Sequence, residues 1–175
     1  MLAYVFWHWP APDVDRVRYA GSLAAFHRAL RAAPPEGFVG SRVREVRGAP
    51  WVPAPLAFED WYLVEDFAAL GALERAAVSG PRRAPHDGAA RLARGGTAGL
   101  YGRLREGAAG ADRVAWFAKP AGMPYPDFLA RVPPAELWQR KLTLGPAPEF
   151  CLAGGNPPAD AAGAITLEVL PVDVE

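Results

Sequence analysis

Three histidines are the side chains best suited to proton chemistry in this sequence of 175 residues. His8 ends an aromatic segment that we expect to be a strand, and side chains two residues apart on a strand share a face. Tyr4 and Phe6 therefore lie on the same side as His8. An imidazole titrates near neutral pH and can give or take a proton. We predict His8 as a catalytic residue with Tyr4 and Phe6 as ligand-binding neighbours. A purely structural His8, hydrogen-bonded at a strand end, is the alternative.

The remaining histidines and the single cysteine offer fewer chemical roles. His86 precedes Asp87, and a carboxylate beside an imidazole can hold it in one tautomer. His86 is therefore the second catalytic candidate, with a helix cap as the alternative. His27 flanks the apolar face of an expected helix, which favours a boundary or interface position. Cys151 has no second cysteine to pair with, and no Cys/His spacing is typical of zinc. We expect an inert buried thiol and no metal.

Aromatic and basic side chains are the further candidates for ligand binding. The chain has six Trp and five Tyr, and their rings could stack on an aromatic ligand. Trp61 is the tryptophan we assign to such a site, although core packing is the alternative. Arg82 and Arg83 begin a segment, residues 80–113, with seven Arg against three acidic residues. Guanidinium groups suit planar anions, so Arg82 and Arg83 are candidate ligand-binding residues, with a solvated helix face as the alternative.

Several functional classes are disfavoured by composition and by the absence of motifs. The 19 basic and 19 acidic residues balance, which is not typical of nucleic-acid-binding proteins. Apolar runs stay under ten residues, whereas a membrane-spanning helix needs about 20. The first residues lack the features of a signal peptide, so we expect a cytoplasmic protein without membrane or nucleic-acid partners. Gly-rich nucleotide loops and the common hydrolase motifs are also missing.

Hydrophobic periodicity predicts alternating strands and helices along the chain. Asp13 and Asp66 are the expected N-caps of the first two helices. The Gly-rich segment at 81–111 is expected to be a bent or interrupted outer helix. The expected strands are 2–9, 38–46, 58–65, 114–119, 137–144, 149–153 and 165–170, and the expected helices are 13–33, 66–80 and 125–132. We therefore predict a βαββα unit with an extra helix over 1–108 and a smaller, degenerate βαββ unit over 112–175, packed as one body.

One known superfamily shares this element order. A Trp-rich third strand, Asp60-Trp61-Tyr62-Leu63-Val64, runs directly into a Phe/Leu-rich helix, residues 67–73. This pattern resembles the ferredoxin-like dimeric α+β barrel superfamily, which includes antibiotic-biosynthesis monooxygenases, EthD-like proteins and stress-responsive barrel proteins. The resemblance implies an α+β fold with two barrel halves, from a homodimer or from two degenerate repeats in one chain. It also implies a pocket between one sheet face and its helices or a partner.

The resemblance leaves two functional interpretations open. One is a small-ligand-binding barrel without an assignable reaction. The alternative is a cofactor-independent, monooxygenase-like or EthD-like enzyme that acts on a small aromatic or hydrophobic molecule with His8 as proton-transfer group. Haem-degrading relatives use a His on the helix after the third strand, and residues 67–79 contain none. We therefore expect no cofactor, with a haem held by His27 or His86 as axial ligand as the alternative.

Overall fold

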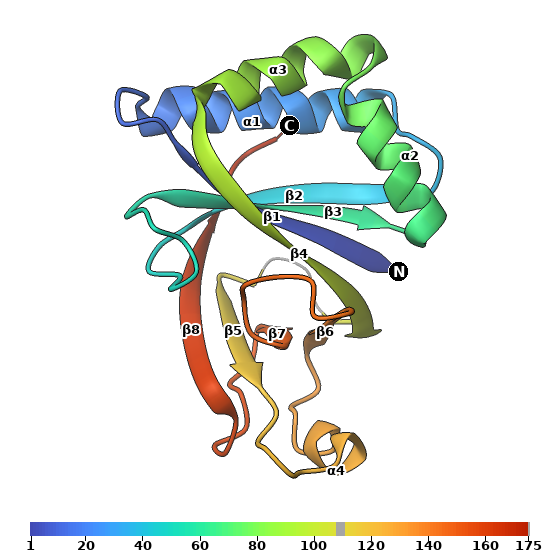
Figure 1. Cartoon of the computed structure of the whole chain (residues 1–175), viewed down its shortest axis with the longest axis vertical. Coiled ribbons are helices and arrows are strands. Elements are labelled where there is room, and N and C mark those ends of the chain that lie inside the picture. Colours follow the sequence, from blue (N-terminus) through green and yellow to red (C-terminus); the bar gives the residue numbers. More distant parts are fainter. Residues whose placement is uncertain (108–110, 175) are drawn as a thin grey trace.

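The computed structural model describes residues 1–107 and 111–174, and over these residues it shows an α+β fold (Figure 1). None of the helices among the described residues is long and apolar enough to cross a membrane. In chain order the elements are β1 (Leu2–Pro10), α1 (Arg16–Ala32), β2 (Phe38–Val46), β3 (Ala57–Val64), α2 (Phe67–Ala77), the short 3-10 helix η1 (Gly80–Arg82), α3 (Arg83–Leu92), β4 (Ala93–Arg105), β5 (Arg113–Ala118), α4 (Tyr125–Leu129), β6 (Glu136–Arg140), β7 (Phe150–Ala153) and β8 (Ala162–Pro171).

The strands form one closed antiparallel sheet in the order β1-β3-β2-β8-β5-β7-β6-β4, and β4 pairs back onto β1. The two halves of this sheet have the same internal order. In the first half the sequence of neighbours is β4-β1-β3-β2, and in the second it is β8-β5-β7-β6. The pairs β2–β8 and β4–β6 join the halves. Helices α1, α2 and α3 lie together on the side of β1–β4, and α4 lies at the far end of the second half (Figure 1).

Strand β1 has apolar side chains on both faces because both faces are covered. Val5 and Trp7 point into the barrel and pack in its central cluster, whereas Tyr4 and Phe6 pack against the helices. Strand β3 alternates in the same way. Its odd-numbered residue Trp61 belongs to the barrel interior, and its even-numbered neighbours face the helices. This alternation decides which polar residues reach which side of the sheet.

The first two helices begin at aspartates. The Asp66 side chain accepts a hydrogen bond from the Ala69 amide, as predicted for the N-cap of α2. The cap of α1 is Asp15, which accepts from the Arg18 amide, and not Asp13. The prediction was therefore wrong by two residues, because either aspartate satisfies the composition of a cap and the sequence does not show which amide lies in reach.

The segment at 81–111 corrects the sequence-based prediction most clearly. Of its described residues, only Arg83–Leu92 is α-helical. Ala93–Arg105 is a strand whose residues from Ala93 to Gly102 pair with β1. Glycine here serves close packing. A Cβ on Gly96 would lie 2.4 Å from the Phe6 ring, and one on Gly95 would lie 2.8 Å from the Trp9 ring. The glycines that weaken a helix are thus what lets large aromatic rings of β1 lie across β4.

A second correction concerns the strand expected at 137–144. Strand β6 ends at Arg140, and the following Leu142 and Thr143 have φ angles of 53° and 56°. Left-handed backbone of this kind ends a strand.

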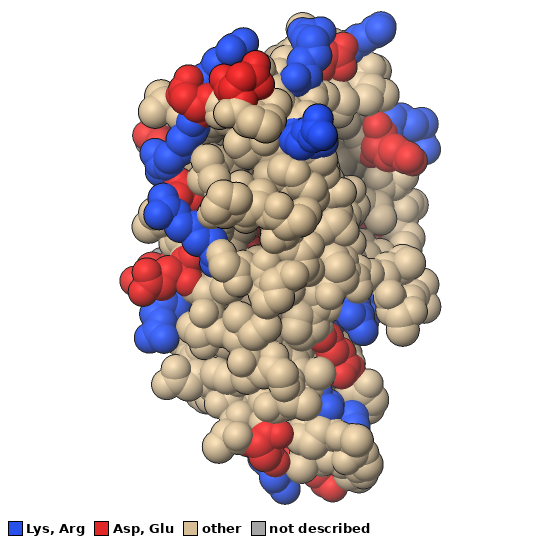
Figure 2. Space-filling view, turned by 60° about the vertical axis from the view of Figure 1, so that its left-hand side comes forward, with Lys and Arg blue, Asp and Glu red and all other residues tan. Residues whose placement is uncertain are grey.

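On the face shown in Figure 2, positive and negative side chains are interspersed around a broad area without either, in keeping with the balanced composition.

Candidate functional site

A cavity of about 680 Å³ lies between strands β1 and β3 and the three helices α1, α2 and α3. Its volume is in the range typical of small-molecule sites. The lining is mainly apolar, with Leu23 and Phe26 from α1 and Leu70 and Leu73 from α2. The polar and aromatic remainder comes chiefly from the sheet: Tyr4, Phe6 and His8 from β1 and Asp60 and Tyr62 from β3, with Tyr19 from α1, Glu74 from α2 and His86 from α3.

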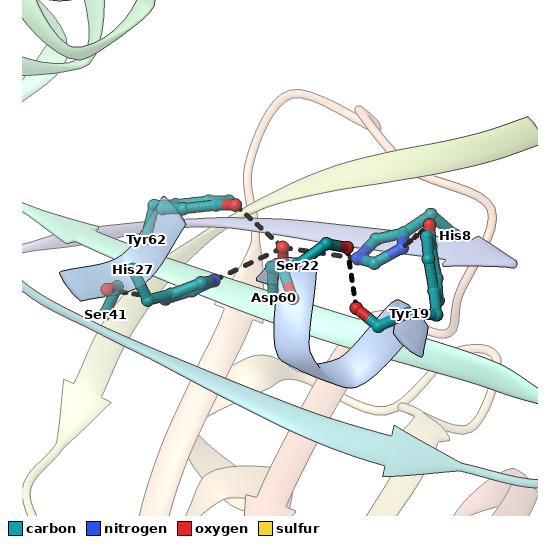
Figure 3. Close-up of polar contacts among 7 residues, drawn as sticks. All are labelled: His8, Tyr19, Ser22, His27, Ser41, Asp60 and Tyr62. Carbon is teal, nitrogen blue, oxygen red and sulfur yellow. Dashed lines mark hydrogen bonds and ion pairs between the residues drawn. The ribbon is translucent and has the colours of Figure 1, made fainter. Parts of the chain in front are cut away.

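Asp60 is the centre of a buried polar cluster beside this cavity. Its Oδ2 atom accepts a hydrogen bond of 2.7 Å from the Tyr62 hydroxyl. The Nε2 atoms of His8 and His27 lie 3.2 and 3.3 Å from the same oxygen, which is ion-pair distance. Figure 3 shows the two imidazoles on opposite sides of the carboxylate, with Tyr19 and Ser41 at the outer ends. His8, His27 and Asp60 are each at most 2% exposed.

The environment of Asp60 keeps its carboxylate ionised. Burial by itself would raise the pKa of Asp60, but the neighbouring His8 and His27 outweigh burial and place the pKa well below its usual range. A buried carboxylate needs compensating positive charge or hydrogen-bond donors. Two imidazoles and one phenol supply them here. The negative charge also acts on the phenols, because burial first and Asp60 second raise the pKa of Tyr62 and Tyr19.

Both ring nitrogens of His8 face a polar side chain, Tyr19 at hydrogen-bond distance from Nδ1 and Asp60 at ion-pair distance from Nε2. A carboxylate can only accept, so the Nε2 atom that faces Asp60 carries the proton. In a neutral imidazole the other nitrogen is then an acceptor, and the Tyr19 hydroxyl lies 2.7 Å from Nδ1. Tyr19 therefore donates to His8, and the three side chains form a phenol–imidazole–carboxylate chain. Because Tyr19 lines the cavity, this chain ends where a ligand would bind.

A second series of polar contacts leads from Asp60 through His27 to Ser41, away from the cavity. The His27 Nδ1 atom lies 2.7 Å from the Ser41 hydroxyl on β2. The ring of His27 stacks on Tyr62, with ring centroids 5.2 Å apart and an interplanar angle of 17°. Neither His27 nor Ser41 is part of the cavity lining. His27 therefore supports Asp60 from behind, and only the His8 branch faces the cavity.

The structure brings four of the sequence-predicted site residues to the cavity. Tyr4, Phe6 and His8 share one face of β1, and the Phe6 and His8 rings stack with centroids 4.9 Å apart. His86 joins them from α3, with its Nδ1 atom 3.1 Å from Asp87 and its ring edge against Phe26. A catalytic role for His8 or His86 stays a prediction.

Three predicted ligand-binding residues lie elsewhere. Trp61 is fully buried inside the barrel, where its indole donates to Glu59, because its odd position on β3 points it away from the helices. Arg82 donates to the carbonyls of Ala33 and Ala76 at the ends of α1 and α2, so it joins these helices. Arg83 is an exposed side chain near Asp87. None of the three lines the cavity.

The site also contains residues that the sequence analysis missed. Asp60 and Tyr62 entered the sequence analysis only as part of a fold pattern, and Tyr19 was not singled out. The available signal was an acidic residue at an even position of a strand otherwise rich in aromatic residues, in register with the His8 face of β1. His27 gave no such signal, because it lies on α1 and its partners Asp60 and Ser41 lie on strands β3 and β2.

Comparisons of the sequence with protein-family models and with curated proteins return no match. Among the described residues, no group of three or more His, Cys, Asp or Glu side chains is arranged to hold a metal ion. The groups that the site offers for chemistry are the Asp60 carboxylate with the imidazoles of His8 and His27, the phenols of Tyr4, Tyr19 and Tyr62, and His86 and Glu74 elsewhere in the lining.

Proposed function

We propose that the protein binds a small aromatic or hydrophobic molecule in the cavity and exchanges a proton with it through Tyr19, His8 and Asp60. The observation that carries this proposal is the position of the Tyr19–His8–Asp60 series of polar contacts. It begins at a buried carboxylate and ends at a phenol on the cavity wall. The apolar lining would exclude water from the bound ligand and strengthen electrostatic interactions around it. This is the enzyme interpretation, with His8 acting through Tyr19.

The proton route follows from the geometry of the chain. The acceptor nitrogen of His8, Nδ1, is already in contact with the Tyr19 hydroxyl, so His8 cannot take a ligand proton there without losing this partner. Tyr19 can accept a ligand proton while its own proton moves to His8, and Asp60 stabilises the imidazolium that forms. A hydroxyl activated by an imidazole and oriented by a carboxylate is the general logic of a catalytic triad.

We also propose that the scaffold is of the ferredoxin-like, dimeric α+β barrel type. The support is the order of the strands, because each half places its first strand between its third and fourth strands, with its second strand outermost. A pocket between the sheet and its helices is what the resemblance implies. One chain supplies both halves of the closed sheet, so no second copy is needed to close it, and a homodimer stays a prediction.

Ligand binding is tested with N-phenyl-naphthylamine, an uncharged dye that fluoresces in apolar sites. The Gly71→Trp variant places an indole on α2 where it lines the cavity. Gly21→Trp is the matched control, because Gly21 is an exposed helix residue with no atoms near an added Cβ. We expect saturable binding to the wild type and to Gly21→Trp, and at least about tenfold weaker binding to Gly71→Trp. Equal binding to all three proteins would contradict the proposal.

Proton transfer is tested with nitrobenzisoxazole, an apolar aromatic molecule whose ring opens when a base removes one proton. We expect the wild type to accelerate this opening above the rate of Gly71→Trp, and Tyr19→Phe and His8→Gln to lose most of the acceleration. Removing one member of such a chain typically costs a factor of about 10² or more. If the wild type is no faster than Gly71→Trp while the dye still binds, the protein is a non-catalytic binding protein.

A further inference from the structure

The charged groups of the cavity are all acidic. Two carboxylates, Asp60 and Glu74, are among its described lining residues, and neither Lys nor Arg is. Asp60 lies on the sheet side, and Glu74 lies on α2, where it is exposed. Both act on the same phenol, because burial first, then Asp60 and then Glu74 raise the pKa of Tyr4. The negative field therefore extends across the cavity from the sheet to α2.

One atom of Asp60 is left without a partner. The Oδ2 atom accepts a hydrogen bond from the Tyr62 hydroxyl and faces both imidazoles. The buried Oδ1 atom has no hydrogen-bond partner among the described residues. A buried carboxylate oxygen without a donor is costly, and native proteins rarely leave one unsatisfied. Asp60 lines the cavity, although Oδ1 itself is shielded in this structure. A ligand there supplies the missing donor if the carboxylate turns Oδ1 toward the cavity.

We propose that the ligand is a protonated amine with an aromatic or apolar body, and that its ammonium group donates to Oδ1 of Asp60. This inference rests on the proposed binding function and names the ligand class. An ammonium offers up to three donors and a positive charge, whereas a carboxylate or phosphate would face two like charges with no Lys or Arg among the described lining residues to offset them.

The walls next to Asp60 also favour such a ligand. The rings of Tyr4 and Tyr62 lie side by side, with centroids 6.2 Å apart and an interplanar angle of 28°. Phe6 stacks on Tyr4 with centroids 6.3 Å apart. A cation next to aromatic faces gains cation–π attraction, and more so away from water. The apolar body of the ligand fits the leucine and phenylalanine side chains of α1 and α2.

The ligand class is tested by displacement of N-phenyl-naphthylamine with three compounds that share one ring system: naphthylethylamine, naphthylethanol and naphthylacetate. A charge-assisted hydrogen bond in a buried site predicts that the amine displaces the dye at a concentration at least about tenfold lower than the alcohol does. The carboxylate is expected to be the weakest of the three. Equal affinities, or a preference for the carboxylate, would overturn the inference while the binding function stands.

Two variants test the carboxylates separately. Asp60→Asn is expected to abolish the preference for the amine over the alcohol. Glu74→Gln is expected to weaken the amine by a factor of about 3, because Glu74 is exposed and its charge is screened, and to leave the alcohol unchanged. Glu36→Gln, at an exposed site outside the lining, is the control and is expected to change neither. If Asp60→Asn does not fold, the three-compound series and Glu74→Gln decide the question. If the dye itself does not bind, the proposed function fails first.

Discussion

Replacing Asp60 with Asn removes the charge at the centre of the buried cluster and keeps the shape of the side chain. The amide oxygen can still accept from Tyr62, so that hydrogen bond is largely retained. What is lost is the charge that faces His8 and His27, 3.2 and 3.3 Å away. Contacts from donors to a buried charged group contribute about 1.5–3 kcal/mol each. We therefore expect Asp60→Asn to lower the free energy of unfolding by about 3 kcal/mol, out of the roughly 5–15 kcal/mol typical of a domain.

The measurement is urea unfolding followed by tryptophan fluorescence, with Asp160→Asn as the control. Asp160 forms an exposed ion pair with Arg131, so its loss should cost less than about 1 kcal/mol. The pH dependence adds a second criterion. The pKa of Asp60 is lower in the folded protein than its ordinary value of about 3.9, so its stabilisation is complete above about pH 4 and is lost as the pH falls through the folded-state pKa. A loss below about 1 kcal/mol at pH 7, or a gap between wild type and variant that widens on acidification, would refute the reasoning.

Three further predictions concern the scaffold. Gly96→Val should destabilise the protein by about 1–3 kcal/mol, because its Cβ would meet the Phe6 ring, whereas Gly88→Ala, with open space around it, should not; urea unfolding of both variants checks this. Arg82→Ala should lower the free energy of unfolding by about 1–2 kcal/mol in the same assay and leave dye binding unchanged, because Arg82 joins helix ends and does not line the cavity. A change in dye affinity larger than that of the control Arg83→Ala would contradict this prediction. Cys151 is 1% exposed, and burial followed by the charge of Glu59 raises its pKa well above the usual value. A colorimetric disulfide reagent should therefore react with Cys151 only after denaturation. Fast reaction of the native protein would contradict this prediction.

Side-chain periodicity was sufficient to predict several parts of the fold. The strand at 38–46 has the predicted bounds, and the helix after Asp66 begins where its cap was expected. The alternation in β1 also predicted that Tyr4, Phe6 and His8 share a face, and all three line the cavity. These features depend on local geometry: a period of two in a strand and a side-chain cap at a helix start.

Long-range pairing explains what periodicity missed. The Ala, Leu and Arg residues of 93–105 are compatible with a helix, but pairing with β1 makes this segment a strand, and its glycines make room for β1 rings that the local sequence does not contain. The Asp60 cluster is assembled in the same manner. Its members come from β1, α1 and β3, and no spacing along the chain connects them. Trp61 was assigned to a ligand site because an indole ring can stack on an aromatic ligand. Its odd position on β3 instead points the side chain into the barrel interior.

The central claim is that the cavity beside Asp60 binds a small apolar molecule, and titration of wild type, Gly21→Trp and Gly71→Trp with N-phenyl-naphthylamine tests it most directly. Both substituted glycines lie on helices outside the closed sheet, and only Gly71 lines the cavity. The account predicts saturable fluorescence enhancement for the wild type and Gly21→Trp and little for Gly71→Trp. Enhancement that is the same in all three, or absent from the wild type, would contradict it.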